Sequence, residues 1–314
     1  MRQTRLHLCR TAAALACLAA LPAVQAQSSV TIYGRLNESV EWQKAGGDTV
    51  TRLQNNSSRI GFKGTEDLGG GLKAGFQLEH GFSPDTGAAN AVFWGRQSEV
   101  NLGGDFGLVR VGNFFSEAYF ATADYISMHN HDTGTSSDAL YAYVSDDTNK
   151  VAYRTPSFGG ATFEIARTLG EGAKEPTYDL AANYGNGPLQ LGAGYTKTDD
   201  SKQLAVRALY EFGAFVLGGY VQRDENNFAP GSRTNVRLSG MYAFGSSEIH
   251  VNVGRAGKNG AVADSEASQF TLAYNYKLSK RTKVYTFYTR LDDGDAGLYG
   301  GDFSSVAFGI RHNF

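Results

Sequence analysis

The final stretch of the chain, SSVAFGIRHNF at residues 304–314, alternates between apolar and polar or small side chains. A β-strand places successive side chains on opposite faces, so this pattern gives one mostly apolar face and one polar face. Its length matches the 9 to 11 residues or so that a tilted strand needs to cross a bilayer. We therefore predict a membrane-spanning strand that ends on the aromatic residue Phe314. The apolar face would carry Ser304, Val306, Phe308, Ile310, His312 and Phe314.

The start of the chain has the features of an export signal, which we predict to cover residues 1–26. Arginines precede an apolar run at residues 12–20, and the small residues Val24 and Ala26 occupy the positions that a signal peptidase reads. The apolar run is shorter than the roughly 20 residues of a transmembrane helix. Cleavage after Ala26 would leave residues 27–314 as one exported domain.

The composition of the predicted mature domain excludes several classes of protein. Both cysteines of the chain, Cys9 and Cys17, leave with the signal, so no disulfide can form. Three basic residues leave as well, and the remainder has 26 basic and 31 acidic residues, a net charge of minus five. We expect no nucleic-acid partner for so acidic a chain. We also expect no cofactor.

Alternating segments recur along the whole mature sequence, although its mean hydropathy is negative. In a barrel half of each strand faces water, which keeps the average polar, and only a helix or a closed barrel satisfies every backbone polar group in a membrane. Short glycine-rich turns alternate with longer polar loops, as they do in outer-membrane barrels. We predict an all-β fold, a transmembrane antiparallel β-barrel of about 16 strands. The pattern over residues 282–290 does not orient that strand, and a soluble β-sandwich is the alternative fold.

One connection, residues 113–147, is much longer than the other turns and loops between the predicted strands. A loop of this length is usually functional or disordered, and its aromatic content argues against disorder. We expect this third extracellular loop to fold into the lumen and narrow it. The loop carries four acidic residues that could face the barrel wall: Glu117, Asp124, Asp132 and Asp138.

Strand parity turns a set of basic residues toward the lumen. Ile60 and Phe62 would point outward and their neighbours inward, and the same argument applies to the strands around Val111 and Val151. Wall cations opposite loop carboxylates would create a transverse field across the water of the pore. The predicted basic wall consists of Arg35, Arg59, Lys63, Arg96, Arg110 and Arg154.

Several short motifs occur in an order and spacing that resemble the Gram-negative general porins, particularly the betaproteobacterial branch. They include SVTIYG at 29–34, SRIGFKG at 58–64, EDLGGGLKA at 66–74, WGRQ at 94–97 and VAYRTPSFGG at 151–160. The resemblance covers the whole mature chain. It implies a homotrimer of sixteen-stranded barrels in the outer membrane, with the third loop inside each barrel.

The resemblance also implies an arginine cluster at the constriction, which maps onto Arg59, Arg96 and Arg154. The family often has a Pro-Glu-Phe-Gly-Gly stretch in the loop, whereas this chain reads MHNHDTG at 128–134. The acidic residues at the constriction are therefore harder to assign. Glu117 and Asp124 are our first choices.

Polar residues on the expected outer face indicate subunit contacts. Glu38 interrupts an apolar outward face, and Gln97, Glu99 and Asn101 have the outward parity if Arg96 points inward. A charge that faces acyl chains is costly, and protein contact would remove that cost. We predict that these four residues lie at a subunit interface.

Together these features predict a passive diffusion channel for small hydrophilic solutes and ions, with mild anion preference and with outer-membrane lipid and lipopolysaccharide around it. The alternative is a solute-specific pore. A barrel enzyme would need a site such as Ser239, His250 and Asn252, but no nucleophile or metal motif accompanies them, and we expect no enzymatic activity. We predict no metal site, although His129 and His131 could in principle hold one and residues 292–297 hint at a calcium loop.

Overall fold

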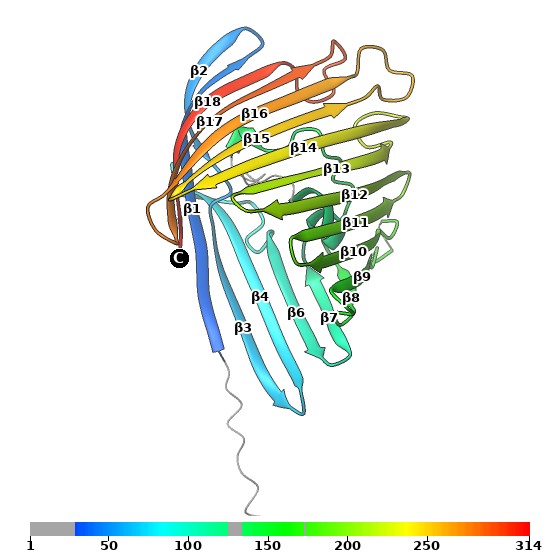
Figure 1. Ribbon diagram of the computed structural model, residues 1–314. Helices are drawn as coiled ribbons and strands as arrows, with labels where there is room; N and C mark the ends of the chain where they lie inside the picture. The colour runs from blue at the N-terminus through cyan, green and yellow to red at the C-terminus, as the bar shows by residue number, and fades with distance from the viewer. Residues whose placement is uncertain (1–28, 125–133, 173) are drawn as a thin grey trace, which may run out of the picture.

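The structure is a computed structural model that describes residues 29–124, 134–172 and 174–314 and consists mainly of one antiparallel sheet (Figure 1). Among these residues no helix combines the length and the apolar character that a membrane crossing requires. The strands are β1 Ser29–Ala45, β2 Asp48–Asn55, β3 Arg59–Gly69, β4 Leu72–Ser83, β5 Ala88–Ala89, β6 Gln97–Gly104, β7 Gly107–Asn113, β8 Lys150–Arg154, β9 Ala161–Thr168, β10 Tyr178–Asn186, β11 Leu189–Thr198, β12 Ser201–Phe212, β13 Phe215–Glu225, β14 Ser232–Phe244, β15 Ser247–Ala256, β16 Ala267–Lys277, β17 Thr282–Asp293 and β18 Phe303–Asn313. The short helices are α2 Glu117–Tyr119, η1 Phe120–Asp124 and η2 Gly134–Ser136.

The sheet closes on itself because β1 pairs with the last strand, β18. On its other side β1 pairs with β2 near one end and with β3 near the other. β2 and β3 together therefore form a single wall strand, interrupted where Ser57 adopts a positive φ of 61°. β5 is a two-residue strand in a loop, so sixteen strands make the closed barrel. The predicted fold and strand number are confirmed.

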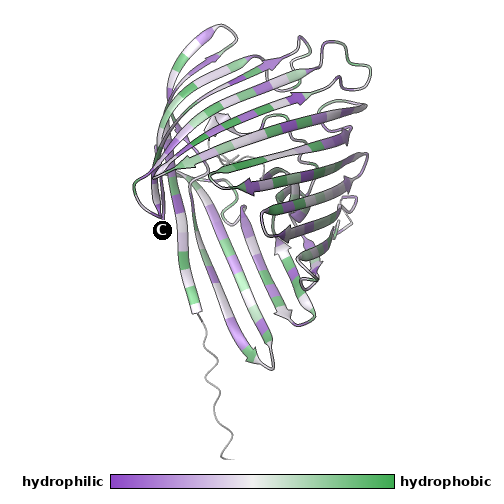
Figure 2. Ribbon diagram, in the orientation of Figure 1, coloured by the Kyte–Doolittle hydropathy of each residue, from purple (hydrophilic) through white to green (hydrophobic). Residues whose placement is uncertain are grey.

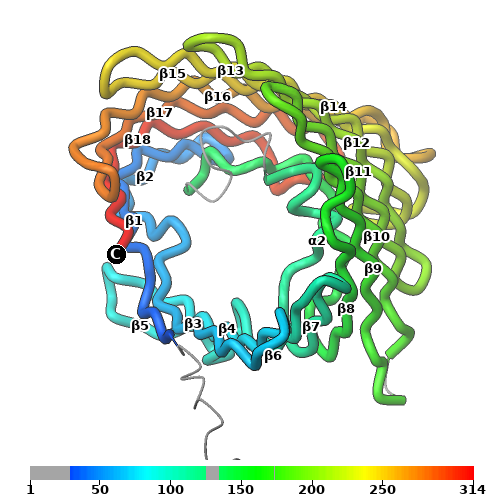
Figure 3. Tube along the Cα trace, turned by 60° about the horizontal axis from the view of Figure 1, so that its bottom comes forward, coloured from blue at the N-terminus to red at the C-terminus, as the bar shows by residue number. Residues whose placement is uncertain are grey.

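The two rims of the barrel differ. At one rim, which we call the short-turn rim, β12–β13 and β14–β15 are joined by two-residue turns. Glycines with positive φ, such as Gly213 and Gly245, occupy these turns, where L-residues are strained. At the opposite, long-loop rim, residues 257–266 and 294–302 form longer connections. Figure 3 shows the resulting ring viewed toward one opening.

Apolar and polar residues alternate along the strands as the sequence predicts (Figure 2). On β12 the outward Leu204 and Val206 are 52% and 51% exposed, whereas Ala205 and Arg207 between them are buried. β18 has the same pattern, with Phe308 exposed and Ala307 buried. The outer skin is therefore apolar at every second residue, and the inner face is polar or small.

The structure orients β17, which the sequence pattern leaves open. Tyr285 and Phe287 are buried on the inner face, and Tyr288 is exposed on the outer face. The Tyr285 ring lies directly over Gly309 of β18, where a side chain would overlap it. Its hydroxyl group donates to Asn37 Oδ1 at 2.9 Å and accepts from Asn56 Nδ2 at 2.7 Å. A glycine on the neighbouring strand thus makes room for the inward tyrosine.

Replacing Gly309 with alanine should destabilise the barrel, because the new Cβ collides with the Tyr285 ring, which is held by hydrogen bonds to Asn37 of β1 and to Asn56 between β2 and β3. We expect a loss of about 1–3 kcal/mol in the free energy of unfolding, the usual cost of overpacking. Urea unfolding of the detergent-solubilised protein measures it. The control is Gly185→Ala, since nothing lies within 4 Å of a Cβ at Gly185. Equal stability of the two variants would contradict the prediction.

Candidate functional site

The long connection between β7 and β8 packs against inward-facing residues of the wall. Ser116 caps α2 by accepting a hydrogen bond from the Ala118 amide, and η1 follows directly. Side chains at Gly192 and Gly194 of β11 would overlap the carbonyl groups of Ala121 and Ala118. The glycines therefore allow the connection to approach the wall closely, and Figure 3 shows α2 inside the outline of the ring.

Wall side chains hold the backbone of the connection in place. The Gln222 carboxamide accepts from the Ala142 amide at 2.8 Å and donates to the Ala142 carbonyl at 3.0 Å. Gln269 similarly accepts from the Ala139 amide at 3.1 Å and donates to the Ser137 carbonyl at 2.8 Å. Each carboxamide thus pairs with the backbone as a neighbouring strand would, which satisfies buried polar groups.

Arginines of the wall make further contacts with the connection. Arg207 Nε donates to the Ala121 carbonyl at 2.6 Å. The fully buried Arg233 donates to the Leu140 carbonyl and forms an ion pair with Asp224, with 2.8 Å between its Nε and Oδ2. Both described pieces of the connection, residues 114–124 and 134–149, are thus bonded to the wall.

The predicted basic wall contains ion pairs rather than isolated cations. Arg96 Nε lies 2.6 Å from Glu79 Oε1, and Arg59 Nε lies 3.7 Å from the same oxygen. Lys63 lies over the Tyr33 ring, with 5.3 Å from its Nζ to the ring centroid. Glu79 also accepts a hydrogen bond of 3.0 Å from the Tyr33 hydroxyl group.

A second group of charges surrounds the start of the connection. Arg110 Nη2 lies 2.6 Å from Glu99 Oε2, and the guanidinium lies 4.0 Å from the centroid of the Phe114 ring. Arg154 contacts Glu117 of α2 and Glu164 of β9, the latter at 2.8 Å from Nη2 to Oε2. Burial raises the pKa of the Glu117 carboxyl, and the nearby Arg154 opposes this effect.

The predicted outward orientation of Gln97, Glu99 and Asn101 is wrong. Glu99 is 9% exposed and contacts Arg110 inside the barrel, and Asn101 donates to Glu99 at 3.2 Å. Val100 is 58% exposed on the outer face. The prediction extended the strand parity from Arg96, but β6 begins at the following residue, so the parity rule does not apply to Arg96.

The acidic residues of the connection do not all face the predicted wall. Asp138 contacts Arg237 of β14 at 2.6 Å from Oδ1 to Nη2, as well as the Tyr220 hydroxyl group, which corrects its predicted position opposite the early strands. Asp124 ends η1. Asp132, together with His129 and His131 of the metal hypothesis, lies outside the described residues.

Two inward glutamates, Glu79 and Glu164, were missed by the sequence argument, and a third, Glu99, was assigned to the outer face. The parity that placed Arg154 inward also places Glu164 inward, because the two residues are opposite one another in the register of β8 and β9. For the lumen face of the strands, the sequence argument considered basic residues only.

The residues of the two rival hypotheses have other contacts. Ser239 donates its hydroxyl group to Asn252, and His250 lies 3.4 Å from Glu248 and 3.0 Å from Asn275. Asp293 of the calcium hypothesis accepts hydrogen bonds of 2.8 Å from the amides of Tyr299 and Gly301. No group of three potential metal ligands occurs within residues 29–124, 134–172 and 174–314.

Replacing Gln222 with leucine should loosen the connection, because it removes both hydrogen bonds to Ala142 and leaves two buried backbone groups unpaired. We expect a stability loss of about 1–3 kcal/mol and faster cleavage of the connection by protease. Limited proteolysis of the folded protein measures the effect. The matched control is Gln190→Leu, since Gln190 contacts Glu211 at an exposed position. Unchanged cleavage would show that the carboxamide is not needed.

The comparisons with known proteins agree with this geometry. The family model described as Gram-negative porin matches residues 11–296. Outer membrane porin protein 32 of Delftia acidovorans is 33% identical, over 96% of this chain and 98% of that protein. Major outer membrane protein P.IB of Neisseria lactamica is 30% identical, over 95% and 97%.

Solved structures give the same result. The anion-selective porin from Comamonas acidovorans has a TM-score of 0.79 and 28% identity, and the match covers 92% of this chain and all of that one. The trimer form of OmpT from Vibrio cholerae has a TM-score of 0.71 at 17% identity, which supports the fold alone. A closed barrel with an apolar skin, a polar inner wall and relatives along its whole length leads to one assignment: the chain belongs to the family of Gram-negative porins of the outer membrane.

Proposed function

We propose that small hydrophilic solutes and ions cross the outer membrane passively through this barrel, between the α2–η1 segment and the wall that carries Arg59, Arg96 and Arg154. The observation that carries this proposal is the docking of the long connection against inward-facing residues of the wall. A narrowed, charge-lined passage sorts solutes by size and charge without an energy source. We also infer that residues 1–26 are removed on export, a segment outside the described residues.

The contacts at the constriction are nearly balanced in charge. Arg59, Arg96, Arg110 and Arg154 are matched by four glutamates within 4 Å, namely Glu79, Glu99, Glu117 and Glu164. Anion preference must therefore arise from further inward cations, such as Arg35 and Lys63. The name of the Comamonas neighbour, an anion-selective porin, supports the same preference here.

Replacing Arg59, Arg96 and Arg154 with glutamine should shift the selectivity toward cations, because three positive charges are removed while the charges of Glu79, Glu117 and Glu164 beside them remain. Reversal potentials in a potassium chloride gradient across a planar bilayer measure the shift. The control is wild-type protein, for which we expect mild anion preference. Clear cation preference of the wild type would contradict the proposed selectivity.

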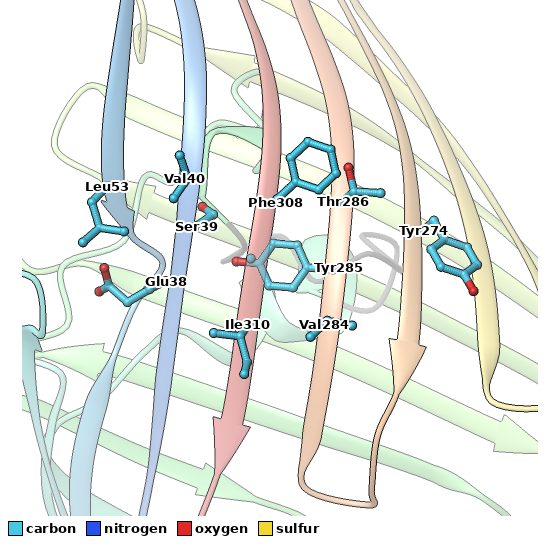
Figure 4. A pocket seen from close by; sticks show the side chains of 11 residues that line it. Glu38, Ser39, Val40, Leu53, Tyr274, Val284, Tyr285, Thr286, Phe308 and Ile310 are labelled. Atoms are coloured by element: carbon cyan, nitrogen blue, oxygen red, sulfur yellow. The ribbon is translucent and has the colours of Figure 1, made fainter.

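Subunit contact is proposed at the outer face around Glu38 of β1. The side chain lies between the exposed residues Leu36 and Val40, and neither carboxylate oxygen has a hydrogen-bond partner among the described residues. Beside it is a mostly apolar hollow of about 460 Å³, whose lining includes Leu53 and Phe308 (Figure 4). Both oxygens are buried, and a buried carboxylate without a donor is costly, whereas a neighbouring subunit could supply one.

We propose a homotrimer, supported by the trimer form of the OmpT neighbour. The outward apolar skin elsewhere would contact lipid and lipopolysaccharide. Gln97, Glu99 and Asn101 no longer support an interface, because they face inward.

Replacing Glu38 with alanine should weaken the trimer, since it removes the acceptor that the neighbouring subunit would bind. We expect the trimer of the variant to dissociate to monomers at a lower temperature than the wild-type trimer. Native mass spectrometry in detergent measures this dissociation. Glu175→Ala, in the exposed loop between β9 and β10, is the control. Trimers of unchanged stability would place Glu38 against lipid instead.

We further propose that the protein is not an enzyme, since the Ser239 hydroxyl group bonds to Asn252 and its strand register places His250 opposite Met241. Turnover of a detergent-presented ester would contradict this. A solute-specific pore remains the alternative channel, and saturable conductance for one solute would favour it.

A further inference from the structure

The long connection carries two phenylalanines, Phe115 and Phe120, whose rings are in contact and partly exposed. The ring centroids lie 6.0 Å apart with an interplanar angle of 79°, so the two rings form an edge-to-face pair. In such a pair, the ring that presents its edge keeps both of its faces uncovered by the other ring. Arg96 of the wall lies over the Phe115 ring, with 5.7 Å from its Cζ to the ring centroid. We call these three side chains the aromatic platform.

The local pattern of burial turns the aromatic platform toward the lumen. Phe114 is buried against alanines of β8 and β9, and Phe115 next to it is partly exposed. On α2 and η1, Ala118 and Ala121 are fully buried where the segment meets the glycines of β11. At about 100° per residue, Phe120 lies on roughly the opposite side of the helix from Ala118. Since α2 lies inside the outline of the ring (Figure 3), the side away from the wall faces the lumen.

Arg96 adds a held cation to the two rings. Its Nε lies 2.6 Å from Glu79 Oε1, and its side chain is 22% exposed. This bond uses Nε and leaves the terminal nitrogens Nη1 and Nη2 to other acceptors. A guanidinium presents its donors in one plane, which suits a carboxylate. The aromatic platform therefore combines partly exposed rings with donors for an anion.

Other aromatic residues of the connection have a structural role that the two phenylalanines do not share. Tyr141 is 8% exposed and lies in a buried cluster with residues of the wall, and its hydroxyl group lies 2.7 Å from that of Thr122. Tyr143 donates its hydroxyl group to Asp147 at 2.7 Å. Phe115 and Phe120 have no polar group to bond, and apolar surface that faces water contributes nothing through burial. Their exposed surface is of use to a solute that can cover it.

We propose that the aromatic platform binds small aromatic carboxylates, such as benzoate, as they pass through the barrel. The carboxylate accepts hydrogen bonds from the terminal nitrogens of Arg96, and the ring of the solute packs against Phe115 and Phe120. The proposal rests on the channel function proposed above and adds a preferred substrate class to it. Contact between aromatic rings is more favourable than the burial of the same apolar area alone. An aromatic acid is therefore bound more tightly than a saturated acid of the same charge and similar size.

The test compares the block of single-channel chloride current by benzoate and by cyclohexanecarboxylate at neutral pH, where both acids are ionised. For the wild type, the half-blocking concentration should be about threefold lower for benzoate, the acid with an aromatic ring. In Phe115→Leu/Phe120→Leu, which keeps Arg96, the two concentrations should be about equal. The matched control is Phe106→Leu, which removes an exposed ring from the turn between β6 and β7 at the short-turn rim. This control should keep the preference for benzoate.

The outcomes separate this proposal from the channel function. Absence of stepwise chloride current would overturn the channel function itself. Normal chloride steps with equal block by the two acids, or a preference for benzoate that the double variant retains in full, would overturn the aromatic platform alone. If the double variant does not assemble, Phe120→Leu by itself decides, and the difference between the two acids should fall below about twofold.

Discussion

The absence of water in the hydrocarbon core of a membrane is the constraint on which the rest of this structure depends. Every backbone amide and carbonyl within the bilayer must find a partner in the protein, and an open sheet would leave two edges unpaired. The pairing of β1 with β18 removes these edges. Closure also creates two environments, lipid outside and water inside, and the period-two alternation of the strands follows from that difference.

Side chains of the barrel wall form hydrogen bonds with the backbone of the long connection, as a neighbouring strand would. Residues 137–142 of the connection have no regular secondary structure, so their backbone groups need partners, and side chains of β13, β14 and β16 provide them. The carboxamides of Gln222 and Gln269 suit this role, since each carries a donor and an acceptor side by side. Glycines on β11 remove the side chains that would hold the connection away. The position of the connection is thus encoded in the wall as much as in the connection itself.

Strand parity made most of the fold predictable from the sequence, because one rule decides the orientation of every residue within a strand. The rule gave wrong orientations where the residue from which it was counted lies outside a strand. Arg96 precedes β6, so counting from it reversed the predicted orientation of Glu99 and its neighbours. The sequence of β17 has aromatic residues on both faces and therefore does not indicate which face is inside. Tyr285 fits inside because Gly309 on the neighbouring strand leaves room for its ring. Such contacts between distant parts of the chain, including that of Asp138 with Arg237, are invisible to local periodicity.

The charged residues of the inner wall occur in two kinds of arrangement. At the proposed constriction, arginines contact glutamates directly, and an ion pair at such short range has a field that falls off quickly in salt water. A transverse field across the open pore requires charges held apart, which Glu117 and Arg154 are not. Along β16 to β3, by contrast, like charges are adjacent, and their potentials add at a distance. The short ion pairs thus hold these arginines and glutamates in place more than they create a field across open water.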